Sequence, residues 1–371
     1  FDEGLKAGKI VYIEDSFYDK YLDCLEAQSV NPGVCADSGL KVVYTPLNGA
    51  GNKLVRKILA RVGVKEIQVV PEQELPDGNF PTVRVPNPEE KDAFDLAVAM
   101  QKTLGADLCV GTDPDCDRVG VACLTASGDV RLLTGNQIGC ILLHYILSQK
   151  KALGKLPKNA AAVKSIVSTE MARAICRKYD TELFDVLTGF KFIAEKIQQF
   201  EETGSNTFEF GFEESYGYLS GSHVRDKDGV NAAMLCCEMA AWYRSQGLTL
   251  GQAMDRLYGR FGCYENRLQS VALPGADGME RMGRIMAGLR AAPPKQLGGE
   301  TVEQITDYRQ GAEGLPPSDV LALSTARGRV IVRPSGTEPK LKLYFSARGG
   351  CMDDARQLCA ALQGDMAAYV K

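Results

Sequence analysis

The chain has 371 residues, of which 45% are hydrophobic and 24% are charged, a composition typical of folded soluble domains rather than of disordered segments. Its 43 basic and 47 acidic side chains give a net charge of −4, so we expect no broad basic surface and no nucleic-acid partner. No apolar run reaches the ~20 residues that a membrane-spanning helix needs, and we expect no membrane partner.

The first part of the chain alternates between strand-like and helix-like patterns. The strand-like runs lie at 40–44, 67–70, 107–110 and 119–124, and helical spacing of apolar residues occurs over 54–62 and 94–104. Short apolar runs bounded by turn residues favour buried strands, and the 3.6-residue period favours helices that cover them. This alternation is typical of an α/β sheet.

The pattern restarts after a stretch rich in Lys, Gly and Pro at 149–160, and a second boundary is expected near 260–265. The predicted elements beyond the first boundary are strands at 161–167, 208–210, 329–332 and 341–346 and helices at 169–179, 189–200, 230–245 and 353–366. We therefore predict three domains, at 1–150, 151–262 and 263–371.

The twelve cysteines are scattered without a Cys-x-x-Cys pair, and the chain has two histidines. These counts argue against both a disulfide framework and a zinc site. We expect reduced thiols that act as small buried hydrophobes in a cytoplasmic protein.

The first loop that could form a functional site contains three alternating acids, Asp113, Asp115 and Asp117, directly after an apolar strand. Such a cluster repels itself unless a cation neutralises it, and oxygen ligands suit Mg²⁺. A calcium EF-hand does not fit, because Arg118 stands at its glycine position and Leu124 at its glutamate position. A phosphatase loop, which also begins Asp-x-Asp, and a solvated acidic turn remain alternatives.

A second loop, 211–218, again follows a predicted strand and contains Glu213 and Ser215. A carboxylate and a hydroxyl two residues apart can hold vicinal hydroxyls of a sugar. A polar segment at 222–229 follows it and includes Lys227. That segment is equally typical of a charged turn and helix N-cap.

A third loop, 333–340, lies between two predicted strands and combines Arg333, Ser335, Gly336 and Thr337. An arginine can donate two hydrogen bonds to phosphate oxygens, hydroxyls can donate further ones, and glycine lets backbone amides approach the phosphate. A plain hairpin turn does not need this set, so the loop predicts a phosphate site.

In this order the three loops resemble those of the α-D-phosphohexomutases, which include phosphoglucomutase and phosphomannomutase. The segment 113–118 is similar to the family's Mg²⁺ loop, 213–215 to its sugar-binding loop and 333–337 to its phosphate-binding loop. Shorter segments at 45–47, 187–191 and 227–229 agree as well. The resemblance implies an α/β protein with consecutive α/β domains of the phosphohexomutase type and a smaller C-terminal α+β domain. The three predicted domains would then be the second, third and fourth of the family.

The resemblance also implies a role for each candidate residue. Asp113, Asp115 and Asp117 would hold Mg²⁺, with Arg118 supporting the transferring phosphoryl group; Glu213 and Ser215 would bind sugar hydroxyls; Arg333, Ser335, Gly336 and Thr337 would hold the non-reacting phosphate; Thr188 and Gly189 would line the cleft, and Lys227 would reach a phosphate. Lys191 is the candidate general acid or base, because Phe190 stands where some relatives carry His.

The implied activity is that of an isomerase that moves phosphate between positions 1 and 6 of a hexose through a bisphosphate, with glucose 1,6-bisphosphate as activator. The family's phosphoserine lies in a Ser-His-Asn-Pro-type segment, whereas the chain's Ser222-His223 is followed by Val224. We therefore expect the chain, which begins at Phe1, to be a truncated or processed product that is inactive alone. A non-catalytic sugar-phosphate binder and a phosphopentomutase remain alternatives. The sequence does not separate glucose, mannose and pentose phosphates. By resemblance, the Glu213-Glu214-Ser215 loop with Phe212 and Tyr216 favours the phosphoglucomutase or phosphopentose side.

Overall fold

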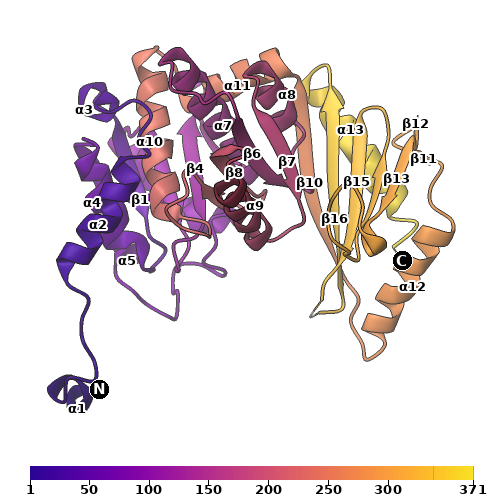
Figure 1. Ribbon diagram of the computed structural model, residues 1–371, viewed down its shortest axis with the longest axis horizontal. Helices are drawn as coiled ribbons and strands as arrows, with labels where there is room; N and C mark the ends of the chain where they lie inside the picture. The colour runs from indigo at the N-terminus through magenta and orange to yellow at the C-terminus, as the bar shows by residue number, and fades with distance from the viewer. Residues whose placement is uncertain (337, 371) are drawn as a thin grey trace. The chain divides into compact units, whose positions relative to one another are not determined.

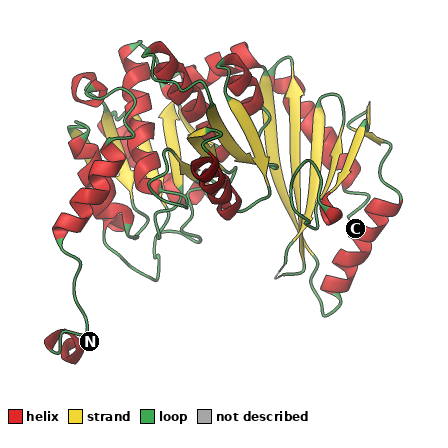
Figure 2. Cartoon of the chain, in the orientation of Figure 1, coloured by secondary structure: helices red, strands yellow, loops and turns green. Residues whose placement is uncertain are grey.

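The computed structural model describes residues 1–336 and 338–370, which form two compact units. The first unit comprises 1–134, 152–154 and 216–251, and the second comprises 135–151, 155–215 and 252 onward. In the described part of the chain no helix combines the length and apolar content that crossing a membrane requires. Both units contain sheets with helices packed against them (Figures 1 and 2), so the predicted α/β class is confirmed.

The first unit is built on a five-stranded sheet with the order β2-β1-β3-β4-β5. The strands are β1 (Lys41–Thr45), β2 (Glu66–Val69), β3 (Leu108–Thr112), β4 (Val119–Leu124) and β5 (Val130–Leu133). The first three are parallel, and β4 and β5 continue the sheet antiparallel. Every residue of β3 is buried, as expected for a central strand covered on both faces.

Several helices accompany this sheet. They are α2 (Asp15–Glu26), α3 (Val34–Ser38), α4 (Gly51–Arg61), α5 (Pro71–Glu74), the 3₁₀ turn η1 (Lys91–Phe94), α6 (Asp95–Leu104) and α10 (Gly229–Ser245), preceded by the short strand β9 (Tyr218–Leu219). The N-terminal α1 (Asp2–Lys6) buries no residue. Helix α6 packs on β1 and β3 through a core that contains Phe94, Ala97 and Cys109. Helix α10 packs along β3 and β4 and is buried over most of its length.

The second unit begins with parallel strands in the order β7-β6-β8. These are β6 (Ala160–Ser165), β7 (Glu182–Val186) and β8 (Thr207–Phe212), and the helices beside them are α7 (Gly135–Ala152), α8 (Met171–Lys178), α9 (Phe190–Thr203) and α11 (Leu250–Phe261). Gly139 lets α7 approach β8, since a Cβ there would lie 2.3 Å from the ring of Phe212.

The second sheet of this unit is antiparallel, with the order β10-β16-β15-β14-β13. Its strands are β10 (Cys263–Ala272), β13 (Gln304–Asp307), β14 (Leu321–Ser324), β15 (Gly328–Pro334) and β16 (Lys340–Gly349), accompanied by the hairpin β11 (Gln296–Leu297) and β12 (Glu300–Thr301), the turn η2 (Tyr308–Gln310) and helices α12 (Gly278–Ala291) and α13 (Met352–Met366). Both helices pack on it, which confirms the predicted C-terminal α+β arrangement. Its other side contributes Ile331 and Tyr344 to a core with Ile166, Val167 and Leu187.

The cysteines behave as expected from their spacing. All twelve are free, and nine are buried. Burial raises the pKa of several of these thiols, for example Cys35 and Cys109 to about 12. Such thiols stay protonated at neutral pH and pack as small apolar side chains.

His144 gives the second unit a pH-dependent stability. It lies on α7 with its Nε2 3.0 Å from the Tyr179 hydroxyl and its ring against Phe261. Burial, helped by the charge of Arg260, lowers its pKa to about 4, below the ~6.5 of an exposed histidine. The unfolded chain therefore binds a proton first as pH falls, and the folded state loses stability between pH 6.5 and 4.

We predict that His144 accounts for about 3 kcal/mol of this acid-induced loss. Urea unfolding at pH 7.0 and 4.5 measures it, and His144→Phe is the variant because the ring remains while the titrating nitrogen is lost. The free energy of unfolding of the variant should fall less over this interval. An equal fall in both proteins would assign the loss to carboxylates instead.

Candidate functional site

The acidic loop begins where β3 ends and is folded around Asp113. This carboxylate is buried, and its Oδ1 accepts the backbone N–H groups of Asp117 (3.0 Å) and Arg118 (2.9 Å). The turn closes with Cys116, which has a positive φ of 59° and donates its N–H to the Asp113 carbonyl at 3.0 Å. One ligand oxygen from each of Asp113, Asp115 and Asp117 lies within 4.8 Å of the other two.

Two glycine-containing segments of the first unit fix this loop. Ala50 donates its N–H to the Pro114 carbonyl (2.8 Å), and a Cβ on Gly49 would lie 2.3 Å from the Pro114 Cα. Gly229 donates its N–H to the Cys116 carbonyl (2.9 Å), and a Cβ there would lie 2.5 Å from that oxygen. The segments 45–51 and 227–229 therefore act as backbone supports, for which a side chain would leave no room.

The charges of the loop favour a cation. Burial raises the pKa of Asp113 to about 7, and the charges of Asp117 and Asp115 add to this effect against the backbone hydrogen bond from Arg118. A divalent cation would stabilise the charged form of Asp113 among these neighbouring carboxylates. Because all the donors are oxygens, the residues present fit a hard ion such as Mg²⁺.

Two basic side chains adjoin the acidic loop within the first unit. Arg118 places its Nε 3.5 Å from Asp113 and 3.7 Å from Asp117, while its Nη1 donates to Glu89 at 2.8 Å. Lys227 places its Nζ 2.8 Å from Asp117. The structure thus places the side chains of Arg118 and Lys227 beside carboxylates of the acidic loop.

The predicted sugar loop begins where β8 ends, in the second unit. Glu213 is buried and accepts the N–H of Gly189 at 2.7 Å. Gly189 has φ 123°, a conformation that L side chains rarely adopt. This bond ties the loop to the segment that contains Thr188, and Ser215 follows as a half-buried residue. Lys191 lies in the first turn of α9, exposed, with its Nζ 5.1 Å from the ring centre of Phe192.

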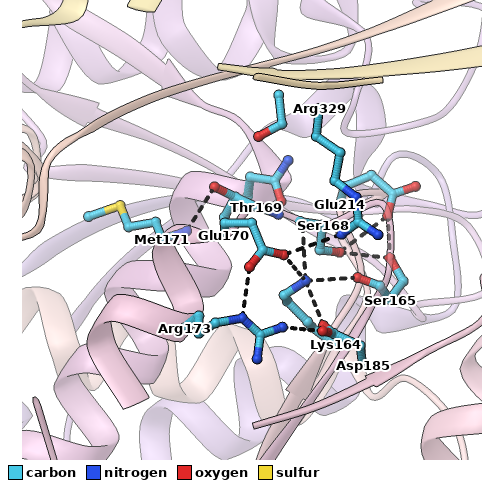
Figure 3. Close-up of polar contacts among 12 residues, drawn as sticks. Lys164, Ser165, Ser168, Thr169, Glu170, Met171, Arg173, Asp185, Glu214 and Arg329 are labelled. Carbon is cyan, nitrogen blue, oxygen red and sulfur yellow. Dashed lines mark hydrogen bonds and ion pairs between the residues drawn. The ribbon is translucent and has the colours of Figure 1, made fainter. Parts of the chain in front are cut away.

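The second glutamate of this loop, Glu214, anchors the loop to the end of β6 (Figure 3). It accepts hydrogen bonds from the hydroxyls of Ser165 (2.9 Å) and Ser168 (3.3 Å). Beside them the fully buried Lys164 donates to the Ser168 carbonyl at 3.2 Å. Glu213 and Glu214 are therefore held from two sides by different elements of the second unit.

Lys164 also neutralises two carboxylates in the same network (Figure 3). Its Nζ lies 2.7 Å from Asp185 and 3.0 Å from Glu170, and both acids also pair with Arg173. Burial alone would raise the pKa of Glu170, but the charges of Lys164 and Arg173 lower it to about 2. Glu170 stays ionised because these two cations, one buried and one half-buried, compensate its charge.

The predicted phosphate loop connects β15 to β16. Ser335 donates its N–H to the Lys340 carbonyl at 2.8 Å, which closes the turn. Gly336 is exposed and has open space around it, and Thr337 lies outside the described residues. Burial and the charge of Glu214 raise the pKa of Tyr344, and the guanidinium group of Arg333, at the end of β15, opposes that rise. The Tyr344 hydroxyl is therefore within electrostatic reach of both the sugar loop and Arg333.

Sequence reasoning missed several residues beside these groups. Glu89 pairs with the predicted Arg118, Ser165 and Ser168 hold Glu214, which lies between the predicted Glu213 and Ser215, and Tyr344 is within electrostatic reach of Arg333. Ser165 and Ser168 had a usable signal, since they follow a parallel strand at the edge where sites form. Glu89 and Tyr344 had none, because their partners are separated from them in the sequence.

The chain matches three domain models of one family, described as phosphoglucomutase/phosphomannomutase. Domain II, an α/β/α domain, matches residues 19–126; domain III, also α/β/α, matches 134–261; and the C-terminal domain matches 286–354. A phosphoglucomutase from Staphylococcus aureus is 37% identical over 341 residues, which are 89% of this chain and 61% of that protein. The chain thus spans about three fifths of the length of the curated relatives it matches.

Solved structures share the fold. Parafusin, a phosphoglucomutase from Paramecium, aligns with a TM-score of 0.69 and 17% identity over 96% of this chain and 61% of that one. An N-acetylphosphoglucosamine mutase from Aspergillus fumigatus, solved with GlcNAc-6P and magnesium, aligns with a TM-score of 0.53 and 14% identity over 96% and 66%. The three domain models match in sequence along most of the chain, and the three loops occur in the same order. The chain belongs to the phosphoglucomutase/phosphomannomutase family.

Proposed function

We propose that this chain carries the metal-, sugar- and phosphate-binding parts of a sugar-phosphate mutase, which interconverts hexose 1-phosphate and hexose 6-phosphate. The observation that carries the proposal is the acidic triad, whose ligand oxygens converge within 4.8 Å beside Arg118. The family membership and the phosphoglucomutase relatives support the same activity. Glucose 1,6-bisphosphate is the proposed activator.

In this proposal each loop has one task. Asp113, Asp115 and Asp117 would hold Mg²⁺, which supplies neutralisation of charge on a transferring phosphoryl group. Arg118 supports that group beside the triad. The paired carboxylate and hydroxyl of Glu213 and Ser215 would bind two sugar hydroxyls.

The remaining groups bind the other end of the ligand. Arg333, Ser335, Gly336 and Thr337 would hold the phosphate that does not react, through an arginine fork, hydroxyls and backbone amides. Thr188 and Gly189 would border the sugar, Lys227, beside the acidic loop, would reach a phosphate, and Lys191 is the proposed general acid or base.

A mutase differs from a one-ended sugar-phosphate binder in that it must accept its ligand in two orientations. We therefore expect glucose 1-phosphate and glucose 6-phosphate to bind the chain competitively, with dissociation constants within about tenfold of each other. Competition calorimetry with both compounds measures this. Binding of only one of them would contradict the mutase proposal and favour a one-ended binder.

Turnover gives a separate expectation. The 371 residues contain no Ser-His-Asn-Pro segment, and phosphoryl transfer needs a donor in line with the acceptor. With glucose 1-phosphate, Mg²⁺ and catalytic glucose 1,6-bisphosphate, the chain alone should form no glucose 6-phosphate at ordinary enzymatic rates. Turnover of about 1 s⁻¹ or more would show that the phosphoryl carrier lies within these residues.

The metal assignment is tested by Asp115→Asn. Removing one of three carboxylates should lower Mg²⁺ affinity about tenfold or more, because the ion prefers charged oxygen ligands. Titration calorimetry measures the change, and Asp129→Asn, in the turn between β4 and β5, is the control with the same loss of charge. Equal Mg²⁺ affinity in the two variants would remove the triad from the metal site.

A further inference from the structure

The second unit contains a cavity whose lining shares no residue with the predicted sugar loop or the predicted phosphate loop. Its volume is about 980 Å³, and it is bordered by α8, β7, α9 and the turn between β14 and β15. That turn lies at the start of β15, whereas Arg333 lies near its end. Arg329 and Arg333 are four steps apart along the strand, or about 13 Å, and the core residue Ile331 lies between them.

The cavity has an excess of positive charge. Six basic side chains line it, against three acidic ones. Two of the acids, Glu170 and Asp185, are already paired with Lys164 and Arg173, and the third, Glu313, accepts the Tyr308 hydroxyl. These three acids therefore do not neutralise the other basic side chains of the cavity.

Three of those cations lack a close acidic partner. Among the described residues no carboxylate lies within 4.0 Å of Arg177, Lys196 or Arg348. Arg329 approaches Glu170 only at 3.7 Å, and its Nε is buried without a hydrogen-bond acceptor. We name these four residues, Arg177, Lys196, Arg329 and Arg348, the arginine pocket.

One arginine of this pocket lies against an aromatic residue. Arg348 lies over the ring of half-buried Tyr264, 6.0 Å from its centre. Burial raises the pKa of Tyr264, and the charge of Arg348 opposes that rise more than that of Arg177 does, while Glu170 adds to it. Like charges held together in a concave surface repel unless an anion enters.

We propose that the arginine pocket is a binding site for a small phosphorylated metabolite, separate from the proposed active site. Guanidinium groups match phosphate oxygens two at a time. Hydroxyls from Thr306, Ser324 and Ser346 also line the cavity and suit the polar body of such a ligand. The volume is at the upper end of the range for small-molecule sites, so a ligand with two phosphates fits it.

Inorganic pyrophosphate is the probe, used with EDTA so that no metal ion bridges it to the acidic loop. The titrations are made on Arg333→Ala, which removes the arginine of the phosphate loop and leaves the arginine pocket intact. One binding event should remain. Adding Arg177→Gln and Arg348→Gln should weaken it at least tenfold, because each lost charge-assisted pair costs about that factor.

The matched control adds Arg284→Gln and Arg356→Gln to the same Arg333→Ala protein. These two arginines are exposed on α12 and α13 and lie outside the cavity, so the net charge changes equally. Unchanged pyrophosphate affinity in the control supports the proposal. Equal weakening in the two proteins, or no binding event in Arg333→Ala, would overturn it.

Two further readouts separate this proposal from others. Thermal unfolding should be unchanged by Arg177→Gln and Arg348→Gln, since both side chains are exposed. A hexaglutamate peptide that bound more tightly than pyrophosphate would overturn the assignment to a small phosphate and indicate an acidic protein partner. Failure of the mutase proposal would appear instead in the glucose 1-phosphate and glucose 6-phosphate competition made on the Arg177→Gln, Arg348→Gln protein, in which this pocket is disabled and Arg333 is retained.

Discussion

Lys164→Met should destabilise the second unit by about 3–5 kcal/mol, the usual cost of removing one partner from a buried ion pair. The side chain of Lys164 is fully buried, and its ammonium group lies between Asp185 and Glu170. Methionine fills a similar volume but leaves both carboxylates with Arg173 as their remaining partner from this network. Urea unfolding followed by circular dichroism measures the change.

Lys151→Met is the control for Lys164→Met. Lys151 pairs with Asp180 at 2.9 Å, but the two side chains are 48% and 86% exposed, and exposed pairs contribute about 0–1 kcal/mol. Equal free energies of unfolding for the two variants would contradict this prediction, because the buried ion pairs of Lys164 would then contribute no more than the exposed pair of Lys151. A loss confined to Lys164→Met would confirm their structural role.

A second readout connects this network to the sugar loop. Lys164 donates to the carbonyls of Ser165 and Ser168, whose hydroxyls hold Glu214. If Lys164 positions this loop, Lys164→Met should weaken glucose 6-phosphate binding under conditions where the variant is still folded. Unchanged affinity in the folded variant would restrict Lys164 to a stabilising role.

Much of the fold could be predicted because its patterns are local. The apolar run at 119–124 is β4, and the predicted helix 230–245 is α10 within one residue. The predicted strand 161–167 ends earlier in the structure, at Ser165, because the chain turns there to place Ser168 near Ser165. Domain borders at 150 and 262 stay predictions.

Elements without a clear period were missed. Helix α7 (Gly135–Ala152) has twelve buried residues and so lacks the polar face by which an amphipathic helix is recognised. Strand β10 (Cys263–Ala272) lies at the edge of its sheet and carries many polar residues, so it has no apolar run. Both are stabilised by neighbours that are distant in the sequence.

The candidate site also has parts that the sequence predicts and parts that it does not. Each of the three loops follows a strand as predicted, because clustered acids, or arginine with hydroxyls and glycine, are visible in a short segment. The supports were not visible: nothing in the sequence distinguishes the buried Lys164 from a surface lysine. The same holds for Tyr344, which looks like an ordinary strand residue until Arg333 is placed beside it.

Arg333→Ala should weaken the binding of glucose 1-phosphate and glucose 6-phosphate alike, by about ten- to a hundredfold, the cost of a lost charge-assisted pair. Equal weakening is expected because the phosphate loop would hold whichever phosphate does not react. Arg333→Lys should still weaken both, since an ammonium group keeps the charge but not the two-pronged hydrogen bonding. Competition calorimetry on the full chain measures all three proteins.

Stability separates a binding role of Arg333 from a structural one. Arg333 is half-buried at the end of β15 beside an exposed turn, so its loss should leave the melting temperature nearly unchanged. Tyr344→Phe is the companion variant, because it removes the hydroxyl within electrostatic reach of Arg333 while keeping the ring in the core with Ile331. It should weaken binding less than Arg333→Ala does. A lowered melting temperature with unchanged affinities in Arg333→Ala would instead make Arg333 an ordinary strand-end residue, and the phosphate site would have to be sought outside this loop.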